Sequence, residues 1–177
     1  MKKESCLICQ IVEGKVPSYR IAQSERAIAI LDINGANPGH CFVIPKAHVP
    51  IMEQVSDEDL ADAIAMANRV SMALFDAAAA EGTNIFICNG IPAGQTVAHF
   101  MVHVIPRKQN DGINLQWQPK KLEEEEASTI ELKLKEELKG VAVEKAVSSS
   151  RKAAAHKGGQ SAGYWEGDDE LALRRIP

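Results

Sequence analysis

HFMVHVIPR, at residues 99–107, is the stretch that decides the fold. Residues two apart share one face of a β-strand. A strand over His99–Ile105 therefore presents His99, Met101 and His103 on one side. The apolar residues between them face the opposite side and belong to the core. A face that offers His, Met and His in a row is atypical of a core, so it indicates a functional site.

Spacing assigns the two histidines of this face to different tasks. At about 3.3 Å per residue, His99 and His103 stand about 13 Å apart on a strand. A zinc ion binds each imidazole nitrogen at about 2.0–2.1 Å. The two histidines therefore cannot readily share one ion, and if one binds a metal the other has another role.

The segments before this strand predict an α+β fold. Apolar and β-branched runs indicate strands over Tyr19–Gln23, Ala27–Leu31, Cys41–Ile44 and Asn84–Cys88. Ser56, followed by three acids and apolar residues at helical spacing, predicts a long helix over Ser56–Ala80 that Gly82 ends. Several strands, one long helix and two further strands form an antiparallel meander. We assign this domain to residues 1–115.

Residues 116–177 have a different character. A charged amphipathic helix is expected over Leu122–Lys139, and residues 148–163 are rich in Ser, Ala, Gly and Lys. We therefore expect a C-terminal helical segment with an extended, partly mobile tail. Trp165 in this tail is a candidate to reach a neighbouring site.

The composition of the 177 residues limits the classes of function. With 45% hydrophobic and 25% charged residues it is typical of a soluble globular protein, and the net charge of −4 gives no basic field to gather nucleic acid. Apolar runs of about 20 residues, which a membrane span requires, are absent, as is a signal peptide. We expect a cytoplasmic protein without disulfides. Cys41 and Cys88, inside apolar strands, are expected to be buried.

Cys6 and Cys9 form a C-x-x-C, the spacing found in zinc sites. The βαβ context of a redox C-x-x-C is absent, and two free thiols are the plain alternative. A zinc site needs two more ligands. The sequence spacing does not choose among the histidines, which are His40, His48, His99, His103 and His156.

Taken together, these motifs resemble the histidine-triad (HIT) family, in particular its small branch with an N-terminal C-x-x-C. The matching segments run in order: CLIC at 6–9, LDIN at 31–34, PGH at 38–40, VIPKAH at 43–48, Asn89, GQTV at 94–97, and the stretch 99–107. They cover about three fifths of the chain. Their order and spacing are specific although each segment alone is not.

The resemblance implies a nucleotide site. In this family the middle histidine of His-x-His-x-His attacks the α-phosphate of a nucleotide, and water then releases the nucleoside monophosphate. Asp32 and Ile33 would bind the nucleoside, with Asp32 on the ribose hydroxyls. The residues that would hold the phosphate are Asn89, Gly94, Gln95, Thr96 and His103. His40 would support the site from behind, and Gln95, His40 and His103 would act beside the nucleophile position.

The resemblance also implies a structural zinc, a ligand class and an assembly. The zinc would be held by Cys6, Cys9, His48 and His99. The ligand would be a purine nucleotide or nucleotide conjugate, with the base and the leaving group undetermined. The chain would form a homodimer through its helix and a sheet edge.

Met101 departs from the family pattern, because it occupies the position of the nucleophilic histidine. A thioether cannot form the phosphoramidate intermediate that an imidazole forms, and His103 is displaced by about 6.6 Å. Loss of a covalent nucleophile lowers a rate by on the order of 10⁴ to 10⁶. Three explanations remain open: a deliberate replacement that captures substrate, a natural branch that binds without covalent chemistry, or direct attack by water.

Three functions follow from these observations. The first is a nucleotidyl hydrolase or transferase of the nucleoside phosphoramidase or dinucleoside polyphosphate hydrolase type, with low activity in this chain. The second is a non-catalytic purine-nucleotide-binding regulatory module. The third is a zinc-stabilised interaction domain that binds no nucleotide.

Overall fold

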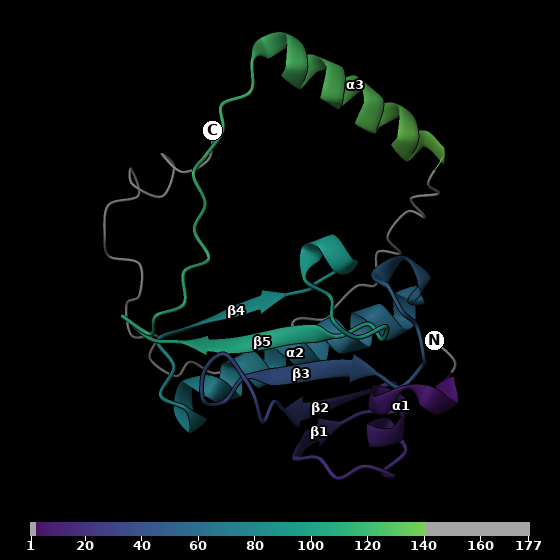
Figure 1. Ribbon diagram of the computed structural model, residues 1–177, viewed down its shortest axis with the longest axis vertical. Helices are drawn as coiled ribbons and strands as arrows, with labels where there is room; N and C mark the ends of the chain where they lie inside the picture. Colours follow the sequence, from purple (N-terminus) through teal and green to yellow (C-terminus); the bar gives the residue numbers. More distant parts are fainter. Residues whose placement is uncertain (1–2, 141–177) are drawn as a thin grey trace, which may run out of the picture. The chain divides into compact units, whose positions relative to one another are not determined.

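Five antiparallel strands form one sheet in the order β1-β2-β3-β5-β4 (Figure 1). The computed structural model describes residues 3–140. The strands are β1 (Arg20–Gln23), β2 (Ala27–Leu31), β3 (Cys41–Pro45), β4 (Gly82–Phe86) and β5 (Val102–Arg107). The helices are α1 (Leu7–Val12), α2 (Asp57–Ala77) and α3 (Glu124–Gly140), with short 3₁₀ turns at Lys3–Ser5, Met52–Gln54 and Ile91–Ala93. The predicted α+β class is confirmed, with β5 inserted between β3 and β4.

Alternation along the central strands separates two apolar layers. In β2, Ala27 and Ala29 pack with residues of α2 on one face. Ile28 and Ile30 pack with Cys6 and Ile8 on the opposite face. The small alanines allow the long helix to lie close to the sheet, whereas the isoleucines fill the space under the short helix α1. Cys6, Cys9 and Met101, three of the candidate site residues, lie on the α1 side.

Helix α2 begins as the sequence predicts and ends earlier. The Ser56 hydroxyl accepts a hydrogen bond from the Asp59 amide at 3.2 Å, which caps the first turn. The helix ends at Ala77 and not at Ala80, because the chain turns through Ala79 in the left-handed region with φ 48°. The amides of Ala78 and Ala80 both donate to the Leu74 carbonyl in this turn.

Two strands begin or end away from their predicted positions. The strand predicted at Asn84–Cys88 runs instead over Gly82–Phe86. The strand predicted to begin at His99 begins at Val102. The Phe100 amide donates to the Val49 carbonyl at 2.7 Å, so the preceding segment is bonded to a loop and not to the sheet. The alternation of faces nevertheless persists: Phe100 lies in the α2 layer and Met101 in the α1 layer.

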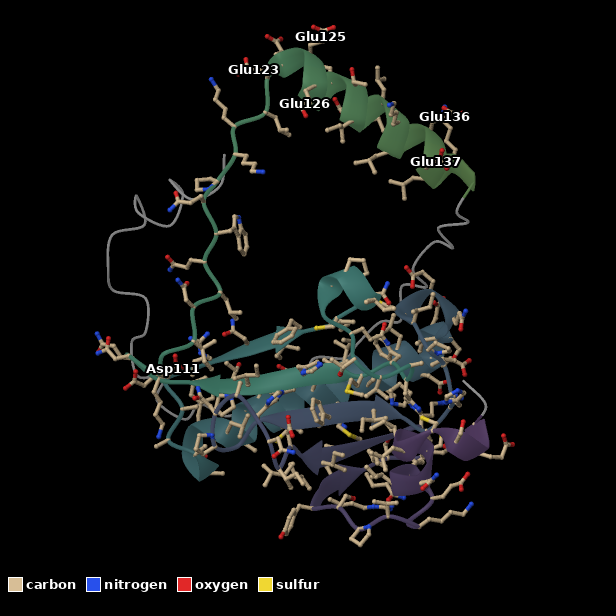
Figure 2. The ribbon with its side chains drawn as sticks, viewed as in Figure 1. Asp111, Glu123, Glu125, Glu126, Glu136 and Glu137 are labelled. Carbon is tan, nitrogen blue, oxygen red and sulfur yellow. The ribbon has the colours of Figure 1, made fainter. Side chains whose placement is uncertain are left out.

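The chain divides after Trp117 into two compact units. In the second unit, acidic residues gather in the first turn of α3, where the helix dipole favours them (Figure 2). Lys139 pairs with Glu136 at 2.6 Å on the exposed surface of this helix. Within residues 3–140, no helix is long and apolar enough to cross a membrane. The predicted mobile tail, His156 and Trp165 lie outside the described residues.

Candidate functional site

Four candidate metal ligands meet beneath the N-terminal helix. Cys6 precedes α1 and Cys9 lies within it, His48 follows β3, and His99 precedes β5. Their ligand atoms all lie within 4.8 Å of one another. Both cysteines and His99 are buried, and His48 is half-buried. The fold thus selects His48 and His99 from the histidines that sequence spacing left open.

The distances between the ligand atoms of this cluster match those expected for tetrahedral coordination of one metal ion. Bond lengths of about 2.3 Å to sulfur and 2.0–2.1 Å to nitrogen place tetrahedral S and N ligands about 3.6 Å apart, and two N ligands about 3.3 Å apart. His99 Nδ1 lies 3.6 Å from the sulfur of Cys6 and of Cys9, and 3.4 Å from His48 Nδ1. His48 Nδ1 lies somewhat closer, at 3.1 Å, to Cys9. The donor set and its spacing therefore fit zinc.

Hydrogen bonding and burial prepare the cluster for a cation. His99 Nε2 donates to the Pro45 carbonyl at 3.0 Å, which leaves the Nδ1 lone pair free for a metal. Burial lowers the pKa of His99, so its imidazole is neutral. Burial, followed by the neighbouring Cys6, raises the pKa of Cys9 to about 11. A bound metal would supply the charge that a buried thiolate needs.

The rings of Phe42 and Phe86 enclose His103, and we call these two rings the aromatic frame. Phe42 of β3 and Phe86 of β4 are both register partners of His103 in β5. The Phe86 ring stacks on the imidazole, with centroids 4.8 Å apart and an interplanar angle of 5°. The Phe42 ring meets it edge-on at 4.9 Å. This frame holds the imidazole plane in one orientation.

His40 sets the tautomer of His103. The Ala36 amide donates to His40 Nδ1 at 3.1 Å, so the proton of the neutral His40 ring lies on Nε2. His40 Nε2 then donates to His103 Nδ1 at 3.3 Å, which leaves His103 Nε2 as an N–H donor. Burial, with a smaller contribution from His40, lowers the pKa of His103 to about 4. Burial also lowers the pKa of His40, although the Asp32 carboxylate, 3.4 Å from Nδ1, opposes this.

Two cavities lie beside Phe42, whose ring contacts both His40 and His103. A small one of about 120 Å³ has Cys88, Gly94, Gln95, Thr96, Met101 and His103 in its wall. A larger one of about 540 Å³ has Leu7, Ile11, Tyr19, Asp32, Ile33 and Asn34 in its wall. Ile8 and Phe42 line both cavities, so the two share a wall. The larger cavity is an apolar chamber, and the small cavity beside it is lined in part by the imidazole of His103.

Asp32 and Gln95 are held by the local backbone. Asp32 Oδ1 accepts from the Asn34 amide at 2.9 Å, and the Asp32 amide donates to the His40 carbonyl at 2.8 Å. The Gln95 amide group donates to the carbonyls of Pro50 and Val97, and its oxygen accepts from the Gly90 amide. The Gln95 side chain therefore fixes the loop around the small cavity and has no free donor.

Asn89 and Cys88 differ from their expected places. Asn89 lines neither cavity, because its side chain bonds to Met52 and Glu53. Cys88 is half-buried in the wall of the small cavity, since β4 ends before it, whereas Cys41 is buried as predicted. Sequence reasoning also missed the aromatic frame. The two-residue spacing of His40, just before β3, and Phe42, within it, was the signal that could have revealed part of it.

Comparisons with known proteins agree on one family. The HIT domain profile matches residues 13–110. Adenosine 5′-monophosphoramidase hnt1 of Schizosaccharomyces pombe is 35% identical over 114 residues, 64% of this chain and 83% of that protein. Adenylylsulfatase HINT3 of Arabidopsis thaliana is 31% identical over 109 residues, 62% of this chain but only 55% of that longer protein. A zinc-bound histidine triad family protein of Mycobacterium smegmatis superposes with a TM-score of 0.61 at 34% identity, covering 76% of this chain and 96% of that one.

Proposed function

This chain belongs to the HIT domain family, and from that premise we propose that it binds purine nucleotides or nucleotide conjugates, with the α-phosphate beside Met101 and His103. The nucleoside occupies the larger cavity, where apolar side chains contact the base. The phosphate occupies the small cavity. The corresponding function is that of a cytoplasmic nucleotidyl hydrolase or transferase that acts on AMP-like substrates.

The observation that carries this proposal is the N–H of His103 at the wall of the small cavity. A neutral imidazole with its proton on Nε2 donates to a phosphate or leaving-group oxygen, and the aromatic frame keeps that donor in place. Asp32 lies at the wall of the adjoining cavity, where its carboxylate accepts hydrogen bonds from ribose hydroxyls. A donor in one cavity and an acceptor in the adjoining cavity suit the phosphate and the ribose of a nucleoside monophosphate.

Met101 decides what this site does with a bound nucleotide. It lines the small cavity and packs with the α1-side layer. Its thioether cannot attack phosphorus and leave again. Hydrolysis then requires attack by water on a phosphate that His103 polarises, so turnover is slow. This residue favours a second candidate, a regulatory module in which nucleotide occupancy itself is the signal.

We further propose a structural zinc ion at Cys6, Cys9, His48 and His99. The cluster geometry and the zinc-bound relative support it. A zinc ion would join α1 to the segments around β3 and β5. Because α1 forms part of the wall of both cavities through Ile8, the ion would stabilise the nucleotide site without touching the ligand.

A homodimer is the proposed assembly. Met72 and Phe75 on α2 are 64% and 43% exposed, which is high for apolar residues of a monomer. Strand β4 pairs only with β5 among the described strands and leaves a sheet edge without a partner. Burial of this helix face and edge between two copies would cover both features. Sedimentation velocity tests it, and a monomer at all concentrations would contradict it.

Calorimetry with AMP, GMP and ribose 5-phosphate tests the proposed function. Both purine nucleotides should bind, and the sugar phosphate should bind more weakly because it leaves the apolar chamber empty. The variant His103→Ala should bind AMP about tenfold more weakly, because a hydrogen bond to a charged oxygen is lost. If neither purine nucleotide binds, the proposed function is wrong and the alternative of a zinc-stabilised interaction domain is favoured.

A further inference from the structure

The carboxylate of Asp111 joins the end of β5 to the loop that precedes β3. Its two oxygens lie 2.5 and 2.8 Å from Nε and Nη2 of Arg107, the last residue of β5, in a bidentate ion pair. The carboxylate also accepts from Asn37 Nδ2 at 2.9 Å, and the same Nδ2 donates to the Pro106 carbonyl at 2.9 Å. The Asp111 side chain is 9% exposed, and Arg107 holds its pKa well below the usual range of a carboxyl. Asp111 is therefore a fixed anchor for the Asn37 side chain.

Asn37 belongs to the loop whose backbone contacts His40. The His40 amide donates to the Asn37 carbonyl at 2.9 Å, and the Ala36 amide donates to Nδ1 of the His40 ring at 3.1 Å. The loop packs tightly here, because a Cβ added to Gly35 would stand 2.6 Å from the Cβ of His40. The position of this loop therefore decides which group reaches His40 Nδ1.

Two groups compete for Nδ1 of His40. The Ala36 amide donates to a lone pair on this nitrogen, whereas the Asp32 carboxylate, 3.4 Å away, would accept a proton carried there. A hydrogen bond to a carboxylate is stronger than one between neutral groups. His40 therefore keeps its lone pair on Nδ1 only while the loop holds the Ala36 amide in place. Release of the loop would favour the tautomer with the proton on Nδ1.

The tautomer of His40 sets the direction of its hydrogen bond to His103. With the proton on Nε2, His40 donates to His103 Nδ1, and His103 carries its own proton on Nε2. With the proton on Nδ1, His40 Nε2 would accept from His103 Nδ1, and His103 Nε2 would present a lone pair. Each neutral ring carries one proton in both states. An N–H donates to a phosphate oxygen, whereas a lone pair repels it.

We propose that Asp111 is a positioning residue: through Asn37 it holds the Ala36 amide on His40 and so makes His103 Nε2 a hydrogen-bond donor. Its effect on nucleotide binding rests on the proposed function, but the tautomer of His103 can be measured without a ligand. Neither Asp111 nor Asn37 lines the small or the larger cavity of the proposed nucleotide site. Both residues therefore act on the site from a distance.

Nitrogen-15 NMR of the histidine rings measures this tautomer in the full chain at pH 7, and His103→Ala assigns the His103 signals. In the wild type, His103 should show a protonated Nε2 and an unprotonated Nδ1. Asn37→Ala removes the tether and keeps the backbone carbonyl that His40 contacts. The two His103 nitrogen shifts should then move toward each other, because the reverse tautomer becomes populated. Asp111→Ala should change the shifts in the same direction.

Asn84→Ala is the matched control. The Asn84 side chain accepts from Nη1 of Arg107 on the β4 side, so this variant weakens the support of the same guanidinium and leaves Asn37 untouched. It should lower the melting temperature without changing the His103 tautomer. An equal shift in Asn84→Ala, an unchanged tautomer in Asn37→Ala, or a wild-type His103 protonated at Nδ1 would overturn the proposal.

Calorimetry with AMP connects the tautomer to the proposed nucleotide site. In Asn37→Ala, AMP affinity should fall in proportion to the fraction of His103 that keeps its proton on Nε2, about fivefold if one fifth does. In the His103→Ala background, the same substitution should cause little further loss. Equal losses in both backgrounds would overturn the action of Asn37 through His103. If the wild type does not bind AMP, the proposed function fails, and the NMR measurements still decide the role of Asp111.

Discussion

His99 and His103 lie four residues apart, yet their surroundings differ in kind. His99 is fully buried, and its two ring nitrogens face a carbonyl and a cluster of protein ligands. His103 is half-buried, with one nitrogen bound to His40 and the other available at a cavity wall. The first environment is complete once a metal is bound. The second needs a ligand to complete it.

Under the proposed function, this difference would let one short segment serve two roles. The cluster around His99 joins α1 to the rest of the domain, so a change there alters the fold. Met101 lies between the two histidines, packs in the α1-side layer and lines the pocket. A change at this position is therefore expected to affect the chemistry of the pocket more than the fold.

The largest expected effect is at this intermediate position. Met101→His should raise the hydrolysis of adenosine 5′-phosphoramidate by on the order of 10⁴-fold, because it restores a nucleophile that can form and break a P–N bond. Steady-state kinetics measure the gain. Met101→Leu, which fills the same space without a nucleophile, is the matched control. An inactive histidine variant that still binds AMP would contradict this interpretation of Met101.

A change in the cluster of candidate metal ligands should lower the stability of the fold. Cys6→Ser should reduce bound zinc from about one ion per chain to near zero and lower the melting temperature by more than about 10 °C, because metal binding contributes several kcal/mol to folding. Metal analysis and thermal unfolding measure the two effects. Cys88→Ser alters a thiol outside the cluster and should keep its zinc. Full zinc retention by Cys6→Ser would remove this cysteine from the ligand set.

A change in the wall of the larger cavity should affect ligand binding alone. Asp32→Asn keeps the acceptor for the Asn34 amide and removes the charge. Its affinity for AMP should fall by about tenfold, because a charge-assisted bond to the ribose is weakened. Affinity for 2′,3′-dideoxy-AMP should not change, since that ligand lacks the ribose hydroxyls. Equal losses for both nucleotides would argue that Asp32 acts through His40 and not through the ribose.

The last expected effect is the acid dependence of the pocket. With a pKa of about 4 in the folded state, His103 is neutral where an unfolded histidine, at about 6.5, becomes charged. The unfolded state binds more protons between these values, so stability falls as pH decreases from about 6.5 to 4. His103→Gln should lose less stability over this range, by at most about 1.4 kcal/mol per pH unit. Urea unfolding at several pH values measures the difference, and parallel curves would mean that His103 is not neutral when folded.

The sequence predicts the elements of this fold better than their ends. Apolar and β-branched runs identify β2 and β3, and the cap at Ser56 locates the start of α2. The start of β5 could not be predicted, because it depends on a hydrogen bond from Phe100 to Val49, 51 positions earlier in the chain. The insertion of β5 between β3 and β4 likewise depends on pairing between distant segments.

The same limit applies to the candidate site. The spacing of His99 and His103 predicts that the two do not share one metal site, and the structure places His99 in the cluster and His103 beside His40. Neither the hydrogen bonds that the Asn89 side chain makes within the protein nor the exposure of Cys88 follows from a local sequence pattern. Both depend on which side chains the folded loops bring near them.

A crystal structure with bound AMP tests the central claim most directly. The account predicts the base in the apolar chamber above Ile33, the ribose hydroxyls on Asp32, and the phosphate beside Met101, within hydrogen-bond distance of His103 Nε2. A nucleotide bound elsewhere on the domain, or a phosphate that does not contact His103, would contradict it.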